Sequence, residues 1–96
     1  MAIQMVPRRS GLPCARAVCD ECGEPIDDVR DGLAVWTEAD PAVRYTHRGC
    51  YRAFEARLGG FWLSDPLDWH LGYLVHNTKF DAKRWARDPL RQMFEA

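Results

Sequence analysis

The sequence predicts a small α+β fold, in which a short finger is followed by packed helices. Three observations support this fold class. The chain has 96 residues, a length that suits one hydrophobic core and leaves no room for a second. Two short segments rich in β-branched and aromatic residues precede several stretches with helical periodicity. Two pairs of Cys and His side chains bracket these segments with the spacing of a metal site.

The composition indicates an ordinary globular chain in a reducing compartment. Apolar residues make up 47% of the sequence, and four Trp, four Phe and three Tyr supply large rings for a compact core. The first ten residues contain no apolar run typical of a signal peptide, and no segment is long and apolar enough to cross a bilayer. Four Cys without a secretory signal favour metal or thiol chemistry over disulfides. We therefore expect an intracellular, cytoplasmic protein without a membrane partner.

The net charge of -1 conceals an uneven distribution along the chain. Residues 14–43 carry two Arg against eight acidic residues, whereas residues 44–60 carry four Arg against one Glu. This asymmetry predicts one acidic lobe and one basic helix. Either could be a docking surface, and an ordinary solvated surface would have the same pattern.

Residues 1–13 contain Pro7, Gly11 and Pro13, and we expect them to form an irregular N-terminal arm. Residues 14–60 form the finger module. It opens with the segment VCDECGEPI, in which two Cys bracket a tight turn completed by Gly23. Residues 33–37 and 43–46 are β-branched and aromatic and are separated by EADP, so they predict a hairpin.

The segment HRGCYRAFEARL predicts a helix that ends at the pair Gly59-Gly60. Tyr51, Phe54 and Leu58 fall at positions i, i+3 and i+7 and would form its buried stripe. The opposite, exposed face would then carry Arg48, Arg52 and Glu55.

Residues 61–96 predict a helical extension that packs on the finger, so that the whole chain is one cooperative domain. Its first helix begins in SDPLDWHLGYLVHN, with Asp65 as N-cap and Pro66 at the first helical position. A further helix is expected from near Thr78, with Asp81 as a capping partner, and the pair Asp88-Pro89 would interrupt it before a last short turn. The side chains expected in the core are Trp62, Leu67, Trp69, Leu71, Leu74, Val75, Phe80 and Trp85.

The strongest chemical signal is the pair Cys19-x2-Cys22, followed after twenty-four residues by His47-x2-Cys50. Zinc prefers four tetrahedral ligands drawn from thiolate and imidazole, and three Cys with one His close that shell. The second pair comes from the first turn of a helix, where the positive end of the helix dipole stabilises a thiolate. These four residues are our predicted zinc ligands, and a thioredoxin-type redox use of Cys-x2-Cys lacks its βαβ context.

Cys14 is left over from this set. It could replace His47 in an all-cysteine site, or join the other three Cys in an iron–sulfur cluster. The His-x2-Cys pair suits tetrahedral zinc better, so we expect Cys14 to be a partly buried bystander thiol.

The order CDECGEPI, hairpin, THRGCYRAF resembles a treble-clef zinc finger. It is similar to the first half of a LIM domain and, in ligand order, to the zinc fingers of poly(ADP-ribose) polymerase. The resemblance covers residues 17–60 and implies a zinc site and a finger fold. A LIM domain would continue with a second Cys-containing module, and residues 61–96 contain no Cys.

The functional class expected from these observations is a non-catalytic, regulatory or adaptor module. A catalytic zinc keeps an open coordination position, whereas the predicted site has four protein ligands. His70 and His76 are six residues apart, so they do not share a helical face and do not form a second catalytic or metal-binding pair. A protein partner is the leading expectation. The alternative is nucleic acid, bound through Arg44, Arg48, Arg52 and a basic stripe that runs from Lys79 through Lys83 and Arg87 to Arg91.

Overall fold

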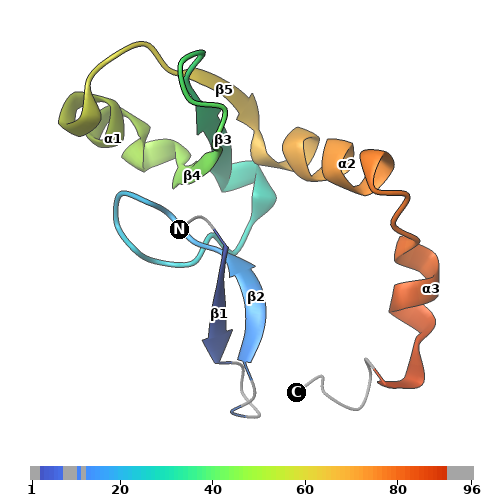
Figure 1. The fold of residues 1–96 in the computed structure, drawn as a ribbon. Helices are drawn as coiled ribbons and strands as arrows, with labels where there is room; N and C mark the ends of the chain where they lie inside the picture. Colours follow the sequence, from blue (N-terminus) through green and yellow to red (C-terminus); the bar gives the residue numbers. More distant parts are fainter. Residues whose placement is uncertain (1–2, 8–10, 12, 91–96) are drawn as a thin grey trace.

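The computed structural model describes residues 3–7, 11 and 13–90. These residues form two antiparallel sheets and three α-helices, which confirms the α+β class (Figure 1). The two-stranded sheet contains β1 (Ile3–Pro7) and β2 (Pro13–Ala17), and the three-stranded sheet has the order β4-β3-β5. The remaining elements are η1 (Val29–Asp31), β3 (Gly32–Trp36), β4 (Arg44–His47), η2 (Arg48–Cys50), α1 (Tyr51–Leu58), β5 (Leu63–Pro66), α2 (Leu67–Asn77) and α3 (Ala82–Arg87).

The irregular arm expected over residues 1–13 is wrong for the part that the structure describes. Residues Ile3–Pro7 form β1, which pairs antiparallel with β2 so that Val6 lies opposite Cys14. Pro7 and Pro13 face each other at the end of this ladder, where a missing N–H donor costs least. The Pro and Gly residues of this segment therefore mark the end of a two-stranded hairpin and not an irregular arm.

The hairpin of β3 and β4 follows the prediction and forms the centre of the core. Ala34 and Tyr45 lie opposite each other and pack with Cys19, Ile26 and Leu67 in one buried cluster. Side chains alternate between the faces of a strand, so Val35 and Thr46 belong to the other face, and they too are fully buried. Both faces of this hairpin are therefore covered.

Helix α1 begins after η2 and ends where the sequence predicts. Gly59 adopts a positive φ of 69° and its N–H donates to the carbonyl of Glu55 at 2.7 Å. Phe54 is fully buried, and its ring packs edge-on against Trp62 at 4.9 Å. Leu58 is exposed, so Phe54 is the main apolar anchor of this helix.

Strand β5 was not predicted, and it changes the start of the following helix. Residues Leu63–Pro66 pair antiparallel with the free edge of β3. Asp65 is thus a strand residue, and Pro66 is the N-cap of α2. The open edge of β3 explains this outcome, because it offers backbone partners that a sequence pattern does not reveal.

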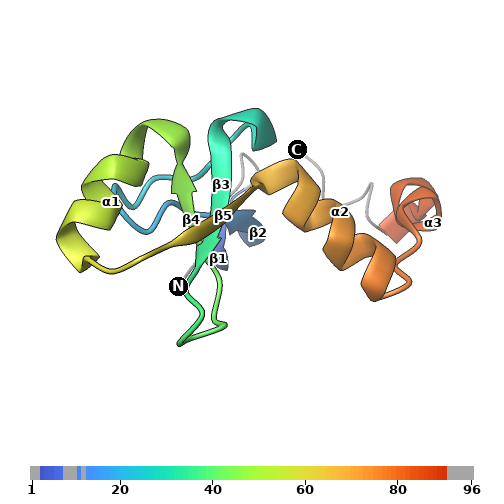
Figure 2. The same ribbon diagram turned by 90° about the horizontal axis from the view of Figure 1, so that it is seen from above.

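Helix α2 contacts the rest of the protein mainly through its first turn. Leu67 is fully buried and Leu71 packs partly against the same core. Beyond this turn the helix leads away from the sheet, and α3 lies at its far end (Figure 2). The expected burial of the later apolar residues is therefore wrong, because Trp69, Leu74, Val75, Phe80 and Trp85 are exposed.

The third helix begins later than predicted. Asp81 is its N-cap and accepts a hydrogen bond from the N–H of Arg84 at 2.9 Å. Lys79 has a positive φ of 57° in the link between α2 and α3. Lys79 therefore shares no helix with Lys83 and Arg87, and the basic stripe is not continuous. The helix ends at Arg87, directly before the pair Asp88-Pro89 that the sequence predicts to interrupt it. The last turn expected around Met93 and Phe94 lies outside the described residues.

Candidate metal centre

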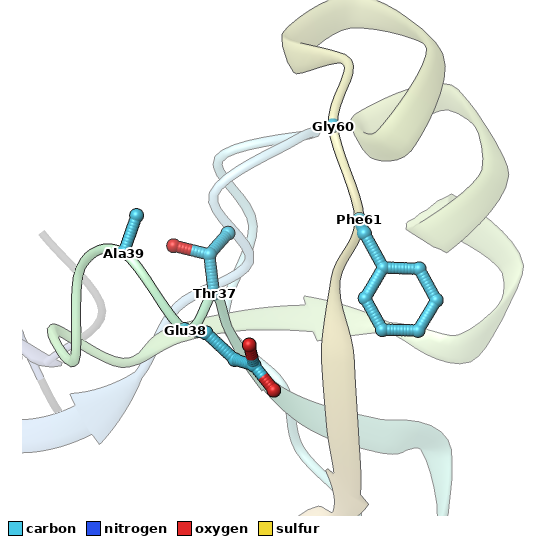
Figure 3. Close-up of a pocket in the computed structure, with 5 residues that line it drawn as sticks. All are labelled: Thr37, Glu38, Ala39, Gly60 and Phe61. Atoms are coloured by element: carbon cyan, nitrogen blue, oxygen red, sulfur yellow. The ribbon is translucent and has the colours of Figure 1, made fainter.

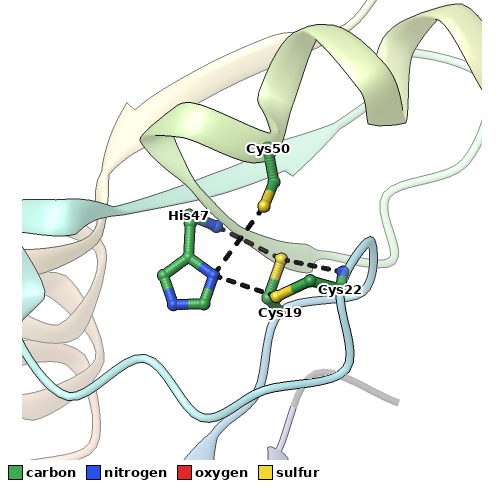
Figure 4. Close-up of side chains that lie close together, drawn as sticks. All are labelled: Cys19, Cys22, His47 and Cys50. Atoms are coloured by element: carbon green, nitrogen blue, oxygen red, sulfur yellow. Dashed lines mark hydrogen bonds between the residues drawn. The ribbon is translucent and has the colours of Figure 1, made fainter.

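The structure brings together the four side chains that the sequence singled out. The sulfur atoms of Cys19, Cys22 and Cys50 and one ring nitrogen of His47 all lie within 4.8 Å of one another (Figure 4). The Nδ1 atom of His47 is 3.4 Å from the sulfur of Cys22 and 4.0 Å from that of Cys50. In a tetrahedral Zn site a ligating sulfur and nitrogen are about 3.5 Å apart, so the spacing fits four ligands around one ion.

Two of these ligand atoms come from a tight turn between β2 and η1. The N–H of Gly23 donates to the carbonyl of Cys19, and the N–H of Cys19 donates to the carbonyl of Glu24, both at 2.9 Å. Gly23 has a φ of 79°, a conformation that side-chain-bearing residues rarely adopt. The turn therefore curls Cys19 and Cys22 toward the same point.

The other two ligand atoms come from the junction between the hairpin and the first helix. His47 is the last residue of β4 and lies opposite Gly32 in the ladder. Cys50 ends η2 and immediately precedes α1. Figure 4 shows the Nδ1 edge of the His47 ring facing the sulfur atoms. The spacing of two residues between His47 and Cys50 thus places both side chains on the same side of this turn.

Backbone N–H groups are directed at the buried sulfur of Cys19. The N–H of His47 lies 3.4 Å from this sulfur, and the N–H of Cys22 lies 3.5 Å from it. Burial raises the pKa of the Cys19 thiol, but the hydrogen bonds from Cys22, His47 and Glu21 outweigh it and lower the pKa from 9.0 to about 7. The Cys19 thiol therefore loses its proton to form a thiolate more readily than an ordinary Cys.

Without a cation, the thiol of Cys50 keeps its proton more firmly than an ordinary Cys, in contrast to that of Cys19. Burial, followed by the neighbouring sulfurs of Cys19 and Cys22, raises the pKa of the Cys50 thiol to about 12. Three thiolates in this space repel one another, and a divalent ion reverses that preference because it deprotonates the thiols that bind it. The donor set therefore fits a soft or borderline divalent metal ion.

Two supporting contacts around the cluster have no signal in the sequence. Asp20 connects the turn to β4, because its N–H donates to the carbonyl of Tyr45 and its carboxylate accepts from the N–H of Tyr45 at 3.1 Å. Arg57 of α1 donates to the carboxylate of Glu21 at 2.9 Å and to the carbonyl of Asp20 at 3.3 Å. Both contacts join residues far apart in the chain, so only the fold reveals them.

The remaining cysteine lies outside the cluster. Cys14 is half-buried in β2, and all four Cys are free thiols. Its position opposite Val6 in the first sheet separates it from the four clustered residues.

The two other histidines also lie apart from the cluster. The Nε2 atom of His70 is 3.0 Å from the hydroxyl of Tyr45, and burial lowers the pKa of His70 while the charge of Asp65 raises it. His76 is exposed near the end of α2.

The cations expected to bind a partner are exposed wherever the structure describes them, but they do not form one surface element, and Arg91 lies outside the described residues. Arg44 lies on β4, Arg48 on η2 and Arg52 on α1. The Nε of Arg48 donates to the carbonyl of Arg30 at 2.8 Å, which ties part of its guanidinium to the protein. The other three, Lys79, Lys83 and Arg87, lie at the far end of α2 and on α3.

A cavity of about 300 Å³ lies at a different place, between the loop after β3 and the link after α1. Figure 3 shows its lining residues Thr37, Glu38, Ala39, Gly60 and Phe61. Phe61 is 77% exposed, and Glu38 is the one ionisable side chain in this lining. The cavity therefore offers mainly apolar contact.

Among the described residues, no helix has the length and apolar character needed to cross a membrane. Comparison with known proteins returned no match from the protein-family models, the curated proteins or the solved structures. The metal-binding arrangement of Cys19, Cys22, His47 and Cys50, which suggests a zinc finger, is thus the feature that connects this chain to a known class of site.

Proposed function

We propose that this chain is a non-catalytic zinc-binding module that docks on a protein partner in the cytoplasm. The observation that carries the proposal is the cluster of three Cys and one His, whose ligand atoms lie within 4.8 Å of one another. Zinc is the ion that best matches thiolate and imidazole ligands with tetrahedral spacing.

The position of the ligands supports a structural role for the zinc. They join the turn at Cys19, the end of β4 and the start of α1, so a bound ion cross-links three segments of the finger. A catalytic zinc binds three protein ligands and keeps the fourth position for water or substrate, whereas the four clustered side chains would occupy all four positions of one ion. The order of turn, hairpin and helix also supports the treble-clef resemblance, and kinship with LIM or polymerase-type fingers is part of this proposal.

Exposed apolar residues on α2 and α3 support a protein partner over nucleic acid. Trp69 is 62% exposed and Tyr73 is 57% exposed. A basic face is the main source of nucleic-acid affinity, and Arg48 and Arg57 already contact groups within the protein. Docking of apolar and aromatic side chains is typical of protein interfaces.

The zinc part of the proposal is tested by metal analysis of single-site variants. We expect one equivalent of zinc in the purified protein and its loss in Cys50→Ser, with most of the fold. Structural zinc contributes on the order of 10 kcal/mol to the folding of small domains. Cys14→Ser is the matched control and should retain the metal. Zinc retained by Cys50→Ser, or lost by Cys14→Ser, would show that the ligand set is wrong.

The partner class is tested by titrating the protein against labelled duplex and single-stranded oligonucleotides at two salt concentrations. Arg48→Ala combined with Arg52→Ala removes two exposed cations of the finger. With a protein partner, nucleic-acid affinity stays negligible for wild type and variant. Binding tighter than roughly micromolar at physiological salt, weakened by the double substitution, would replace the protein partner with nucleic acid. A pull-down with and without nuclease gives an independent check.

A further inference from the structure

Helix α2 is held against the finger by one face of its first turns. Within Leu67–Asn77, all of which the structure describes, Leu67 is buried and His70 and Leu71 are half-buried, while every other residue is exposed. These three residues recur at positions i, i+3 and i+4, so they share one face of the helix. The docking of α2 therefore depends on three side chains, of which His70 is the one that can carry a charge.

His70 makes the polar contact of this face, with Tyr45 of β4. Its Nε2 atom is 3.0 Å from the hydroxyl oxygen of Tyr45, and the centres of the two rings are 5.3 Å apart in an edge-on arrangement. Tyr45 is 3% exposed and belongs to the same buried cluster as Leu67. Among the described residues, His70 is the one hydrogen-bond partner of this hydroxyl. The contact thus satisfies a polar group inside the core, where an unpaired hydroxyl is costly.

The hydrogen bond depends on the protonation state of His70. In a neutral imidazole one ring nitrogen accepts, and the tautomer with the proton on Nδ1 lets Nε2 accept the hydroxyl hydrogen of Tyr45. In the imidazolium form both nitrogens carry a hydrogen, so Nε2 can only donate. The hydroxyl oxygen of Tyr45 would then have to accept, and its own hydrogen would lose its acceptor. Protonation of His70 therefore breaks the bond seen in the structure and leaves a buried donor unpaired.

The surroundings of His70 also disfavour its charged form. Burial lowers the pKa of His70 from its ordinary value of 6.5, and the charge of Asp65 on β5 opposes this shift only in part. Strand β3, which packs against α2, has no ionisable side chain. The other charged or titratable side chains on α2 and on the elements around it are exposed to solvent, which screens them: Arg30, Asp31, Arg44, Asp68, Tyr73 and His76.

The sign of the pH effect follows from the lowered pKa. The docked helix binds fewer protons at His70 than a helix that has left the sheet, where the pKa of the ring returns to its ordinary value. Docking is therefore favoured in full above about pH 6.5, and this contribution is lost as the pH falls through the lower pKa of the docked state. Acid thus acts in the direction of opening.

We propose that Tyr45 and His70 form an acid-sensitive latch, which holds α2 on the sheet at neutral pH and releases it when His70 is protonated. Strand β5 is paired with β3, and the backbone of Tyr45 exchanges hydrogen bonds with Asp20, so the finger does not depend on the latch. The latch goes beyond the zinc-binding function proposed above, because it contains none of the four metal ligands.

The three His of the chain allow a direct test by NMR of the ring nitrogens. Full-length, zinc-loaded protein is titrated with free zinc present between about pH 8 and pH 5, the range in which His changes its charge. His76 is exposed on the same helix and is the internal reference, while His47 reports whether the metal stays bound. We expect His70 to take up its proton at a lower pH than His76 while the His47 ring keeps its metal-bound signals.

Amide hydrogen exchange on the same samples measures the release of α2. The protection factors of the α2 amides should fall over the range in which His70 titrates, by up to about tenfold per pH unit, as expected for one proton. In His70→Gln the carboxamide can still accept from Tyr45 but takes up no proton, so α2 protection should not change with pH. His76→Gln is the matched control and should keep the wild-type dependence.

Four results would overturn the inference. His70 titrating together with His76 or above it would mean that docking does not disfavour its charge, whatever the Gln variant does. Constant α2 protection from about pH 8 to pH 5, the range in which His titrates, would mean that acid does not release the helix. An unchanged pH dependence in His70→Gln would assign the effect to another group. Loss of the metal at His47 before α2 opens would show that acid acts on the zinc ligands instead.

Discussion

The residues that support the metal cluster act through contacts between distant segments. Arg57 and Glu21 form the clearest of these contacts, because the Glu21 side chain is only 15% exposed and the guanidinium also lies 5.8 Å from the centre of the Phe54 ring. The ion pair thereby holds α1 against the turn that carries Cys19 and Cys22. Such a contact positions ligands without binding the metal.

We predict that Arg57→Ala lowers the free energy of unfolding by about 1 kcal/mol, since the guanidinium is half exposed and solvent screens the pair. Metal affinity should fall with it, because α1 and the turn are then less firmly held together. Arg52→Ala on the exposed face of the same helix is the control and should have little effect. Chemical denaturation measures the free energy of unfolding, and competition with a zinc chelator measures the metal affinity. Equal effects of both substitutions would argue against a positioning role for Arg57.

At the scale of elements, β3 connects the metal centre to the helical extension. Gly32 of this strand lies opposite His47, and Leu67 of α2 packs directly over it. A Cβ atom at Gly32 would lie 2.5 Å from Cδ2 of Leu67 and 3.1 Å from Cγ2 of Ile26. The missing side chain of Gly32 is therefore what allows α2 to dock.

Gly32→Ala should therefore destabilise the protein by about 1 to 3 kcal/mol, because Leu67 and Ile26 must shift. Gly49→Ala is the matched control, since a Cβ there meets no atom within 4 Å. Thermal unfolding of the zinc-loaded proteins compares the stability of Gly32→Ala and Gly49→Ala with that of the wild type. A Gly32→Ala protein as stable as the control would mean that Leu67 is less tightly packed than the structure shows.

The same packing predicts a contrast between two neighbouring residues of α2. Leu67→Ala should cost about 2 to 5 kcal/mol, because the side chain is fully buried. Trp69→Ala should change stability by about 0.5 kcal/mol or less, although Trp69 is the larger residue, because its ring is exposed. Denaturant titration of the two zinc-loaded variants measures both changes in the free energy of unfolding. A larger effect for Trp69 than for Leu67 would contradict the docking of α2 through its first turn.

For the whole molecule, the arrangement predicts a single unfolding unit that depends on the metal. Strand β5 completes the sheet of the finger, and Leu67 and Cys19 belong to the same buried cluster. The segment after residue 60 is therefore joined to the finger by backbone pairing as well as by apolar contact.

Zinc-loaded protein should unfold in one transition by both circular dichroism and tryptophan fluorescence, since Trp62 reports on the junction of α1 and β5. A strong chelator should abolish that transition and unfold the finger, because metal binding and folding are linked. Magnesium added in place of zinc should not restore it. Two separate transitions in the zinc-loaded protein would show that residues 61–96 fold on their own.

The sequence by itself determined the features that depend on short-range spacing. The hairpin, the end of α1 at Gly59 and each of the two ligand pairs, Cys19-x2-Cys22 and His47-x2-Cys50, follow from patterns within a few positions, because turn, cap and ligand-pair geometry are local. Only the tertiary structure decided that residues 3–7 and 63–66 become strands, since each needs a partner strand from elsewhere in the chain. It also decided that Leu67 is buried while Trp69 is exposed. Periodicity reveals an apolar helix face, but its burial depends on whether another element of the fold covers that face.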